Sequence, residues 1–105
     1  MHATIRRYEG VAQNGTDELK RKITDGLIPK LSALPGFGGY YVIESDTGVL
    51  TSFSLFDTSA QAGESTRVAS NWVREQKLET ALPNAPKITS GEVVVLHRAG
   101  ELVQA

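Results

Sequence analysis

The sequence contains no cysteine, which excludes disulfide bonds, thiolate metal ligands and cysteine nucleophiles. It has only two histidines, His2 and His97, and no spacing of carboxylates around them typical of a zinc site, so we expect no metal. No apolar run approaches the roughly 18 residues that a membrane span requires. The first residues also lack the basic and apolar regions of a secretion signal. We therefore predict a cytoplasmic protein without membrane association.

An excess of charge of one sign is missing as well. The chain has 11 lysines and arginines against 12 acidic residues, a formal net charge of −1 at pH 7. A protein that binds nucleic acid normally carries a basic face. The nearest candidate is the run 20–22, but three successive residues of a helix point in three directions. The composition therefore argues against a nucleic-acid partner.

Familiar catalytic motifs are equally scarce. Ser52 and Ser54 have no adjacent base and no nucleophile-elbow motif around them. The glycine-rich stretch 36–39 follows an expected helix instead of opening one, so it indicates a turn and not a dinucleotide site. The sequence thus predicts a fold more directly than a reaction.

What the sequence does contain is one pattern twice: an apolar strand, an amphipathic helix and a second apolar strand. The copies cover about residues 3–44 and 49–97 of a 105-residue chain. A chain of this length forms one domain, so we expect a single domain over residues 1–105.

The first copy begins with an expected strand over residues 3–9, followed by a helix that starts near residues 14–16. Pro29 removes a backbone hydrogen bond from this helix, so we expect a kink there. An apolar strand over residues 37–44 completes the copy. The apolar stripe of the helix repeats every fourth residue: Leu19, Ile23, Leu27 and Leu31.

The second copy follows a hairpin turn at residues 46–48 and starts with an expected strand over 49–56. Thr58 and Gln61 have the spacing of a capping box, which predicts the start of the second helix. The last strand is expected over residues 92–97, which include four consecutive apolar residues. One face of the second helix is marked by Val68, Ala69, Trp72, Val73 and Gln76.

The order βαββαβ favours a ferredoxin-like α+β plait, in which a four-stranded antiparallel sheet carries both helices on one face. The strands over 37–44 and 92–97 are apolar at both odd and even positions, whereas a sheet with one face in water should alternate. Burial is worth about 25 cal/mol per Å² of apolar surface. We therefore expect a homodimer that packs through the open sheet faces.

Several segments carry a family resemblance that spans most of the chain. The chain resembles the antibiotic biosynthesis monooxygenase family of the dimeric α+β barrel superfamily. The resemblance implies a pocket between sheet and helices. Known activities of the family include cofactor-independent oxidation of polycyclic phenols and haem degradation. The segments that carry it are residues 34–37, 39–41, 69–73, and 82–86 together with 91–93.

Trp72 is the leading candidate for the implied pocket, because an indole offers both an aromatic wall and an N–H donor. The competing interpretation is a core tryptophan on the apolar face of its helix. Asn71 is a second candidate, although it points roughly 100° away from Trp72 on the helix, and an exposed position is the alternative.

Alternation along the strands supplies the remaining pocket candidates. We assign Arg7, Tyr41, Phe53 and His97 to the side that faces the helices. An arginine in such a cavity could stabilise an enolate or a carboxylate. If the alternation of the first strand is reversed, Arg6 and Tyr8 take this place instead.

The haem-degrading branch of the family uses an asparagine on the first strand, together with a tryptophan and a histidine near the second helix. Only the tryptophan has a match here, Trp72. The first strand offers threonine and arginine, and Gln76 and Lys77 stand where a histidine would be needed. We therefore expect neither haem nor another cofactor.

The resemblance thus implies a cofactor-independent monooxygenase that acts on a small aromatic or polyketide-like substrate. The alternative is a non-catalytic dimeric protein that binds a small apolar or aromatic ligand, because no acid and base are paired in the sequence. Turnover or its absence would separate the two hypotheses.

Overall fold

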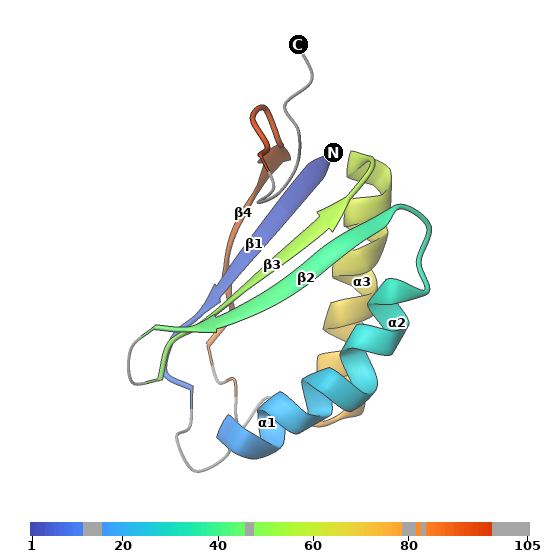
Figure 1. Ribbon diagram of the computed structural model, residues 1–105. Coiled ribbons are helices and arrows are strands. Elements are labelled where there is room, and N and C mark those ends of the chain that lie inside the picture. Colours follow the sequence, from blue (N-terminus) through green and yellow to red (C-terminus); the bar gives the residue numbers. More distant parts are fainter. Residues whose placement is uncertain (12–15, 46–47, 79–81, 83, 98–105) are drawn as a thin grey trace.

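The computed structural model of the chain describes residues 1–11, 16–45, 48–78, 82 and 84–97. The cap expected near residue 14 and most of the hairpin turn at 46–48 lie outside these residues. Figure 1 shows the helical elements packed on one face of a single sheet. The elements in chain order are β1 (His2–Tyr8), α1 (Thr16–Lys22), η2 (Ile23–Leu27), α2 (Ile28–Ser32), β2 (Phe37–Glu44), β3 (Leu50–Phe56), α3 (Ser59–Glu75) and β4 (Lys87–Glu92).

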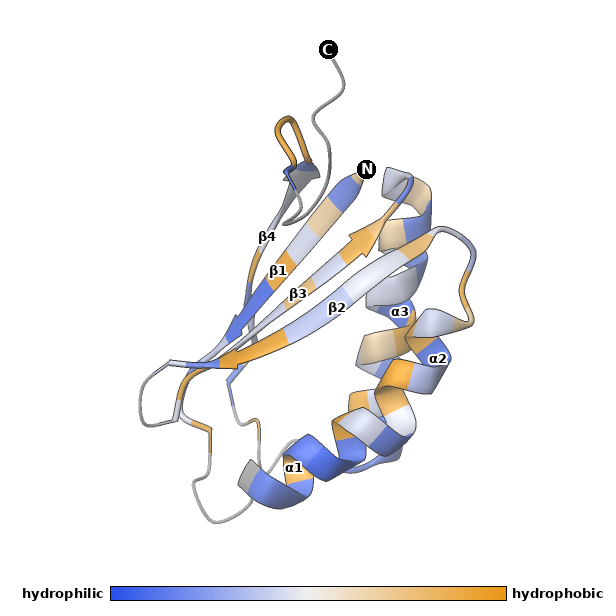
Figure 2. Cartoon of the chain, viewed as in Figure 1, coloured by the Kyte–Doolittle hydropathy of each residue, from blue (hydrophilic) through white to orange (hydrophobic). Residues whose placement is uncertain are grey.

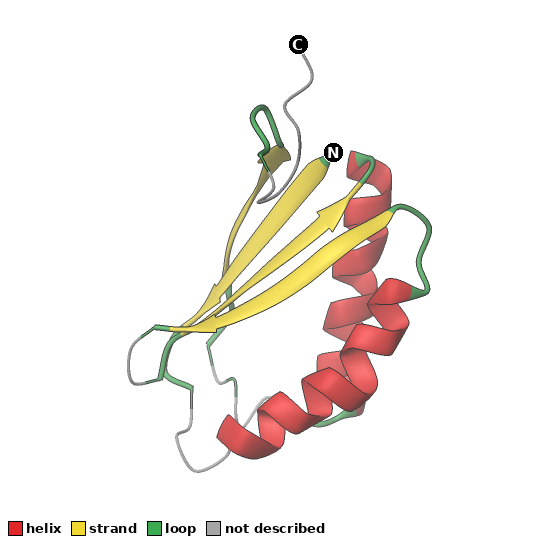
Figure 3. Cartoon of the chain, viewed as in Figure 1, coloured by secondary structure: helices red, strands yellow, loops and turns green. Residues whose placement is uncertain are grey.

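The four strands form one antiparallel sheet in the order β2-β3-β1-β4. The other face of this sheet carries no described helix (Figure 3). The expected ferredoxin-like α+β plait is therefore confirmed. In the register of the sheet, Arg6 of β1 lies opposite Ser52 of β3 and Ile88 of β4.

The first helical segment is continuous but irregular. α1 passes into η2, a turn of π-helix in which the Ile28 backbone N–H donates to the Ile23 carbonyl, five residues back. Pro29 then lies in the first turn of α2, directly after this π-helical turn, and it has no N–H to donate to the preceding turn. The irregularity that the sequence predicts at Pro29 is thus a wider turn just before it.

α3 begins as the sequence predicts. The Thr58 hydroxyl accepts a hydrogen bond from the Gln61 backbone N–H at 3.2 Å, and the Gln61 side chain accepts one from the Thr58 N–H at 3.1 Å. This reciprocal capping box satisfies two backbone donors at the helix start. Trp72 of α3 joins the core, which also holds Leu19, Leu27, Leu31 and Leu50.

The alternation assigned to the strands is wrong, because even-numbered residues face the helices. Along β3 the side chains of Leu50, Ser52, Ser54 and Phe56 are buried, while the odd-numbered residues between them are only half-buried. On β1, Thr4 and Arg6 are buried and Arg7 is exposed. A strand side chain points to alternate faces, so one wrong parity moves every candidate to the other side of the sheet.

The position of the last strand also differs from the prediction. β4 is Lys87–Glu92, and the expected strand over 92–97 begins where β4 ends. His2 at the start of β1 pairs with Glu92, and beyond this pair the Val93 backbone N–H donates to the Met1 carbonyl at 2.8 Å. Val94 and Val95 are 88% and 85% exposed, and Figure 2 shows this apolar segment standing away from the sheet. Backbone pairing therefore overrides the apolar run.

Candidate functional site

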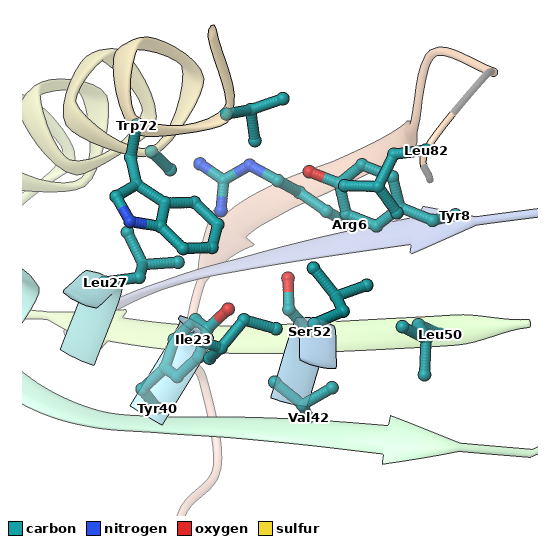
Figure 4. A pocket seen from close by; sticks show the side chains of 13 residues that line it. Arg6, Tyr8, Ile23, Leu27, Tyr40, Val42, Leu50, Ser52, Trp72 and Leu82 are labelled. Atoms are coloured by element: carbon teal, nitrogen blue, oxygen red, sulfur yellow. The ribbon is translucent and has the colours of Figure 1, made fainter. Parts of the chain in front are cut away.

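A cavity of about 40 Å³ lies between the helix-facing side of the sheet and the helical layer. Figure 4 shows side chains from β1, β2 and β3 meeting side chains from η2 and α3 around this inner cavity. Apolar residues make most of the wall, and the polar groups come mainly from the sheet. The polar and aromatic residues around the inner cavity are Arg6, Tyr8, Tyr40, Ser52 and Trp72.

Arg6 is the charged group of the inner cavity. Its side chain leaves the middle of β1 toward the helices and is only 5% exposed. The guanidinium donates a hydrogen bond of 2.5 Å to the Thr66 hydroxyl of α3. Among the described residues around the cavity there is no carboxylate. A buried cation therefore faces the cavity with a neutral partner.

Two tyrosine hydroxyls stay protonated beside this cation. Burial raises the pKa of Tyr8 above its ordinary value, and the positive charge of Arg6 offsets part of this rise. Burial also raises the pKa of Tyr40, while a hydrogen bond with Ser52 acts in the opposite direction. A phenol with a raised pKa remains a hydrogen-bond donor at neutral pH. The sheet thus presents neutral donors and one cation to the cavity.

Trp72 forms the helix side of the cavity and is 3% exposed. Its indole packs against the π-helical turn, where a Cβ placed on Gly26 would lie 2.9 Å from the indole Nε1. Only glycine leaves room for this close approach. The π-turn and its glycine therefore position the aromatic wall.

A second and larger space, the outer groove, adjoins the inner cavity. It lies between α3 and the side of the sheet formed by β1 and the edge strand β4. Its volume is about 310 Å³. It contains two arginines, Arg6 and Arg74, and none of its described lining residues is acidic. The residues that border both spaces are Arg6, Tyr8, Ala69, Val73 and Leu82.

The structure separates the residues that the sequence groups as pocket candidates. Trp72 borders the inner cavity. Arg7, Tyr41 and Phe53 extend to the opposite face of the sheet, since they alternate with the buried even-numbered residues. There Arg7 forms an ion pair of 3.0 Å with Glu9, and Tyr41 is 62% exposed.

Two further candidates lie outside the described cavity lining. Asn71 is half-buried, and its side-chain oxygen accepts a hydrogen bond from Arg74. His97 is exposed and lies beyond the end of β4. The assignment of His97 to the helix-facing side depended on a strand that ends at Glu92.

Arg6 and Tyr8, the alternative for a reversed first strand, are the residues that border the cavity. Tyr40 and Ser52 were missed as site residues. Ser52 had a signal in the sequence, because β3 lies inside the sheet and a polar residue on its helix-covered side needs a partner or a cavity. Tyr40 lies on the edge strand β2 and had no such signal.

The described side chains do not suit a metal or a haem iron. No group of three histidine, cysteine or acidic side chains comes together among the described residues. His97 is exposed beyond β4, and His2 lies at the start of β1. The described lining of the inner cavity offers no imidazole near Trp72.

None of the helices in the described part of the chain has the length and apolar character needed to cross a bilayer.

Comparison with known proteins gives a fold and leaves the chemistry open. No protein-family sequence model and no curated protein sequence matches the chain. Among solved structures, a candidate antibiotic biosynthesis monooxygenase from Nitrosomonas europaea has a TM-score of 0.73 at 15% identity, covering 90% of this chain and 100% of that one. A second candidate monooxygenase, from Caulobacter crescentus, has a TM-score of 0.71 at 18% identity, with 90% of both chains covered.

A protein of unknown function from Nitrosomonas europaea is similar to the same degree, with a TM-score of 0.70, 17% identity and 95% of both chains covered. Identities this low establish a shared backbone arrangement and carry no activity across. The structural neighbours nevertheless match over nearly the full length of this chain. The protein therefore has the fold of these antibiotic biosynthesis monooxygenase structures, an α+β plait with a four-stranded antiparallel sheet.

Proposed function

We propose that the protein is a cofactor-independent monooxygenase that oxidises a small phenolic or enolic substrate between the sheet and the helices. The observation that carries this proposal is the lining of the inner cavity. One buried cation, three hydroxyl groups and an indole surround an apolar space, and its described lining contains no acid. Such a site favours a bound anion over the neutral molecule.

In this mechanism the substrate is its own reductant. A phenol or enol that binds near Arg6 ionises more readily, because the guanidinium stabilises the anion in a space with little water. Tyr8 and Tyr40 remain neutral and can donate hydrogen bonds to the developing oxyanion. Trp72 closes the helix side of the space that receives the oxygen atom of the substrate.

The electron balance closes without a cofactor. The substrate anion transfers one electron to dioxygen, and the resulting radical pair joins through a new carbon–oxygen bond to form a peroxide anion. This anion becomes a hydroperoxide when it takes up from water the proton that the substrate released to water on ionisation. Loss of water from a CH–OOH group leaves a carbonyl. One oxygen atom stays in the product, the other leaves as water, and the substrate supplies all four electrons.

The size of the inner cavity restricts how a substrate is bound. A water molecule needs about 10–15 Å³ and a benzene site about 150 Å³, so 40 Å³ is too small for an aromatic ring. The outer groove, at about 310 Å³, is large enough. The ring therefore lies in the outer groove, and its oxygen reaches the inner cavity past the shared residues Val73 and Leu82.

Oxygen consumption with a panel of hydroquinones and anthrones tests the activity. Tyr40→Phe removes a hydroxyl of the inner cavity, while Tyr41→Phe removes one from the opposite sheet face. We expect Tyr40→Phe to lower kcat/KM at least about tenfold, because removal of one oxyanion-hole donor typically costs about 10²–10³-fold in kcat. Tyr41→Phe should stay within about twofold. No oxygen uptake with any member of the panel contradicts the proposal.

The absence of a general base favours one alternative, a non-catalytic protein that binds a small ligand. No aspartate, glutamate or histidine occurs in the described lining of the inner cavity or the outer groove. Native mass spectrometry of the purified protein distinguishes the two functions. A metabolite that remains bound and unchanged under oxygen supports the alternative.

We also propose that two copies associate through the open sheet face. On this face Tyr41 and Ile43 are 62% and 47% exposed, and Ile5 and Phe53 lie beside Tyr41 in the same row of the sheet. Monomers rarely expose apolar patches beyond a few hundred Å². Light scattering should give twice the chain mass of 11.3 kDa. A stable species of single mass at micromolar concentration contradicts this assembly.

A further inference from the structure

The outer groove has an unbalanced charge. Arg6 enters it from β1 and Arg74 from the last turn of α3, while no described lining residue is acidic. The nearby carboxylate of Glu9 is outside the lining and is already paired with Arg7 at 3.0 Å and Lys87 at 3.5 Å. Two cations therefore face the groove without an acidic partner among the described residues that line it.

The burial of Arg6 indicates that its guanidinium needs a further partner. Removing a guanidinium from water costs several kcal/mol unless it gains a charged partner or a full set of hydrogen bonds. The described partner of Arg6 is one hydroxyl, that of Thr66, which itself donates to the Ala62 carbonyl at 3.2 Å. A threonine oxygen can orient the guanidinium and cannot neutralise it. The remaining donors suit an anion that comes from outside the chain.

The walls of the groove define the rest of the ligand. Val73 of α3 faces Pro86 and Ile88 across the groove, and the Ile88 side chain is 55% exposed. Thr66, Ser70 and Arg74 follow one another at intervals of four residues, so they line the groove along a single stripe of α3. An apolar body can thus lie between Val73 and Ile88 while its polar end reaches this stripe.

We propose that the outer groove binds a small organic acid, with its carboxylate on Arg6, its apolar or aromatic body against Val73, Pro86 and Ile88, and Arg74 attracting it at the rim. This inference deepens the proposed function and rests on it for the idea that the bound molecule is a substrate. It adds the substrate class: an aromatic compound with a carboxylate beside the phenol or enol that reacts, so that the five donors of the Arg6 guanidinium serve both groups. Binding itself can be measured without turnover.

The test compares two probes of the same shape, the anion 2-naphthoate and the neutral 2-naphthamide, by isothermal titration calorimetry with the purified protein. We expect naphthoate to bind at least tenfold more tightly than naphthamide. Raising the sodium chloride concentration from 20 to 200 mM should weaken naphthoate binding only, because salt screens the attraction between charges.

Variants assign the effect to particular residues. Arg6→Met should remove the preference for naphthoate, a loss of tenfold or more. Arg74→Gln should weaken naphthoate two- to threefold and reduce the salt dependence, since Arg74 is exposed. Arg67→Gln is the matched control: Arg67 lies on the same helix, is exposed and pairs with Glu64, and it is not a described lining residue of the groove. It should leave both affinities unchanged.

Thr66→Val provides a second variant if Arg6→Met fails to fold, because it removes the partner that orients the guanidinium. It should weaken naphthoate at least threefold and leave naphthamide unchanged. The inference is overturned if the two probes bind equally or if neither binds. It is also overturned if naphthoate keeps its full affinity in both Arg6→Met and Thr66→Val. If naphthoate binds as expected but no hydroquinone or anthrone consumes oxygen, the proposed oxidation is wrong and the acid site stands.

Discussion

The two faces of the sheet contrast in a way that separates a site from a contact surface. On the face covered by helices, the buried side chains of the two middle strands include Thr4, Arg6, Ser52 and Ser54. On the open face, the corresponding rows hold Ile5, Phe53 and Tyr41. The covered face thus buries several polar side chains among its apolar ones, and the open face exposes an apolar cluster.

Each face carries residues that are unusual in a stable monomer: polar side chains that are buried on the covered face, and apolar side chains that are exposed on the open face. Buried polar groups weaken a core unless they are paired, and exposed apolar groups weaken solubility. The proposed ligand would account for the buried polar groups, and the proposed second copy of the chain would account for the exposed apolar groups. The same contrast shows which substitutions would test each explanation.

The largest effect should follow from Trp72→Ala. Trp72 closes the covered side and is 3% exposed, so its truncation opens a large void against the π-turn. We expect a loss of about 3–5 kcal/mol in the free energy of unfolding. Urea titration followed by far-UV circular dichroism measures it, with Trp72→Phe as the milder control. A loss below about 1 kcal/mol would show that this side is not the core.

Charges on the open face test the proposed contact between copies. Tyr41→Glu combined with Ile43→Glu places two carboxylates in a surface that a dimer would bury. We expect the dissociation constant to rise at least about 100-fold, or about 2.7 kcal/mol, in sedimentation equilibrium. Thr24→Glu, on the exposed side of η2, is the control and should not change it. Equal dissociation constants for the two proteins would place the contact elsewhere.

Glycine substitutions compare a tight position with an open one. Gly26→Ala adds a Cβ 2.9 Å from the Trp72 Nε1, whereas Gly63→Ala on α3 meets no atom within 4 Å. Alanine favours a helix over glycine by about 1 kcal/mol, so Gly63→Ala should stabilise by about that amount. Gly26→Ala should destabilise by about 1–2 kcal/mol through overpacking. Equal changes in thermal unfolding would mean that Gly26 does not position the indole.

Substitution of Arg6 tests whether this buried cation contributes to the stability of the fold. Arg6→Met keeps most of the side-chain volume and removes a charge that is 5% exposed. Apolar replacement of buried ionic groups is often neutral or stabilising. We expect the free energy of unfolding to stay within about 1 kcal/mol of the parent or to rise, while naphthoate binding is lost. A large loss of stability would assign Arg6 to the framework and not to the ligand.

The fold could be predicted because its signals are local. Thr58 and Gln61 specify the start of α3 through their own backbone hydrogen bonds. The strand predicted over residues 37–44 is β2 with the same bounds. The strand at 92–97 was wrong because β4 must pair with β1, and His2 already pairs with Glu92. Such pairing depends on residues about 90 positions away, which no local pattern contains.

The site was harder to predict for the same reason. Apolar Phe53 and Leu55 alternate with Ser52 and Ser54 on β3, and the usual rule places the apolar residues toward the helices. Here the apolar residues face the open side, and the serines face the covered side. A sequence cannot reveal that a buried face is polar until the cavity that accounts for it is known. Trp72 was accessible to prediction because its helix has one apolar face.

The smallest expected effect is a pH dependence that belongs to the covered face. Burial raises the folded-state pKa of both Tyr8 and Tyr40, above the value of about 10 for an unfolded tyrosine. At a pH between the two values, the unfolded chain has released protons that the folded chain retains. Raising the pH therefore favours unfolding, and the stability present below about pH 10 is lost as the pH rises through the folded-state pKa.

Urea midpoints measured from pH 8 to 11 should consequently decline above about pH 10. Tyr8→Phe and Tyr40→Phe should each reduce this decline, and the double variant should reduce it further, because phenylalanine carries no ionisable proton. A decline of the same size in the double variant would assign the titration to groups outside the inner cavity. That result would contradict the view that burial raises the pKa of Tyr8 and Tyr40 on the covered face.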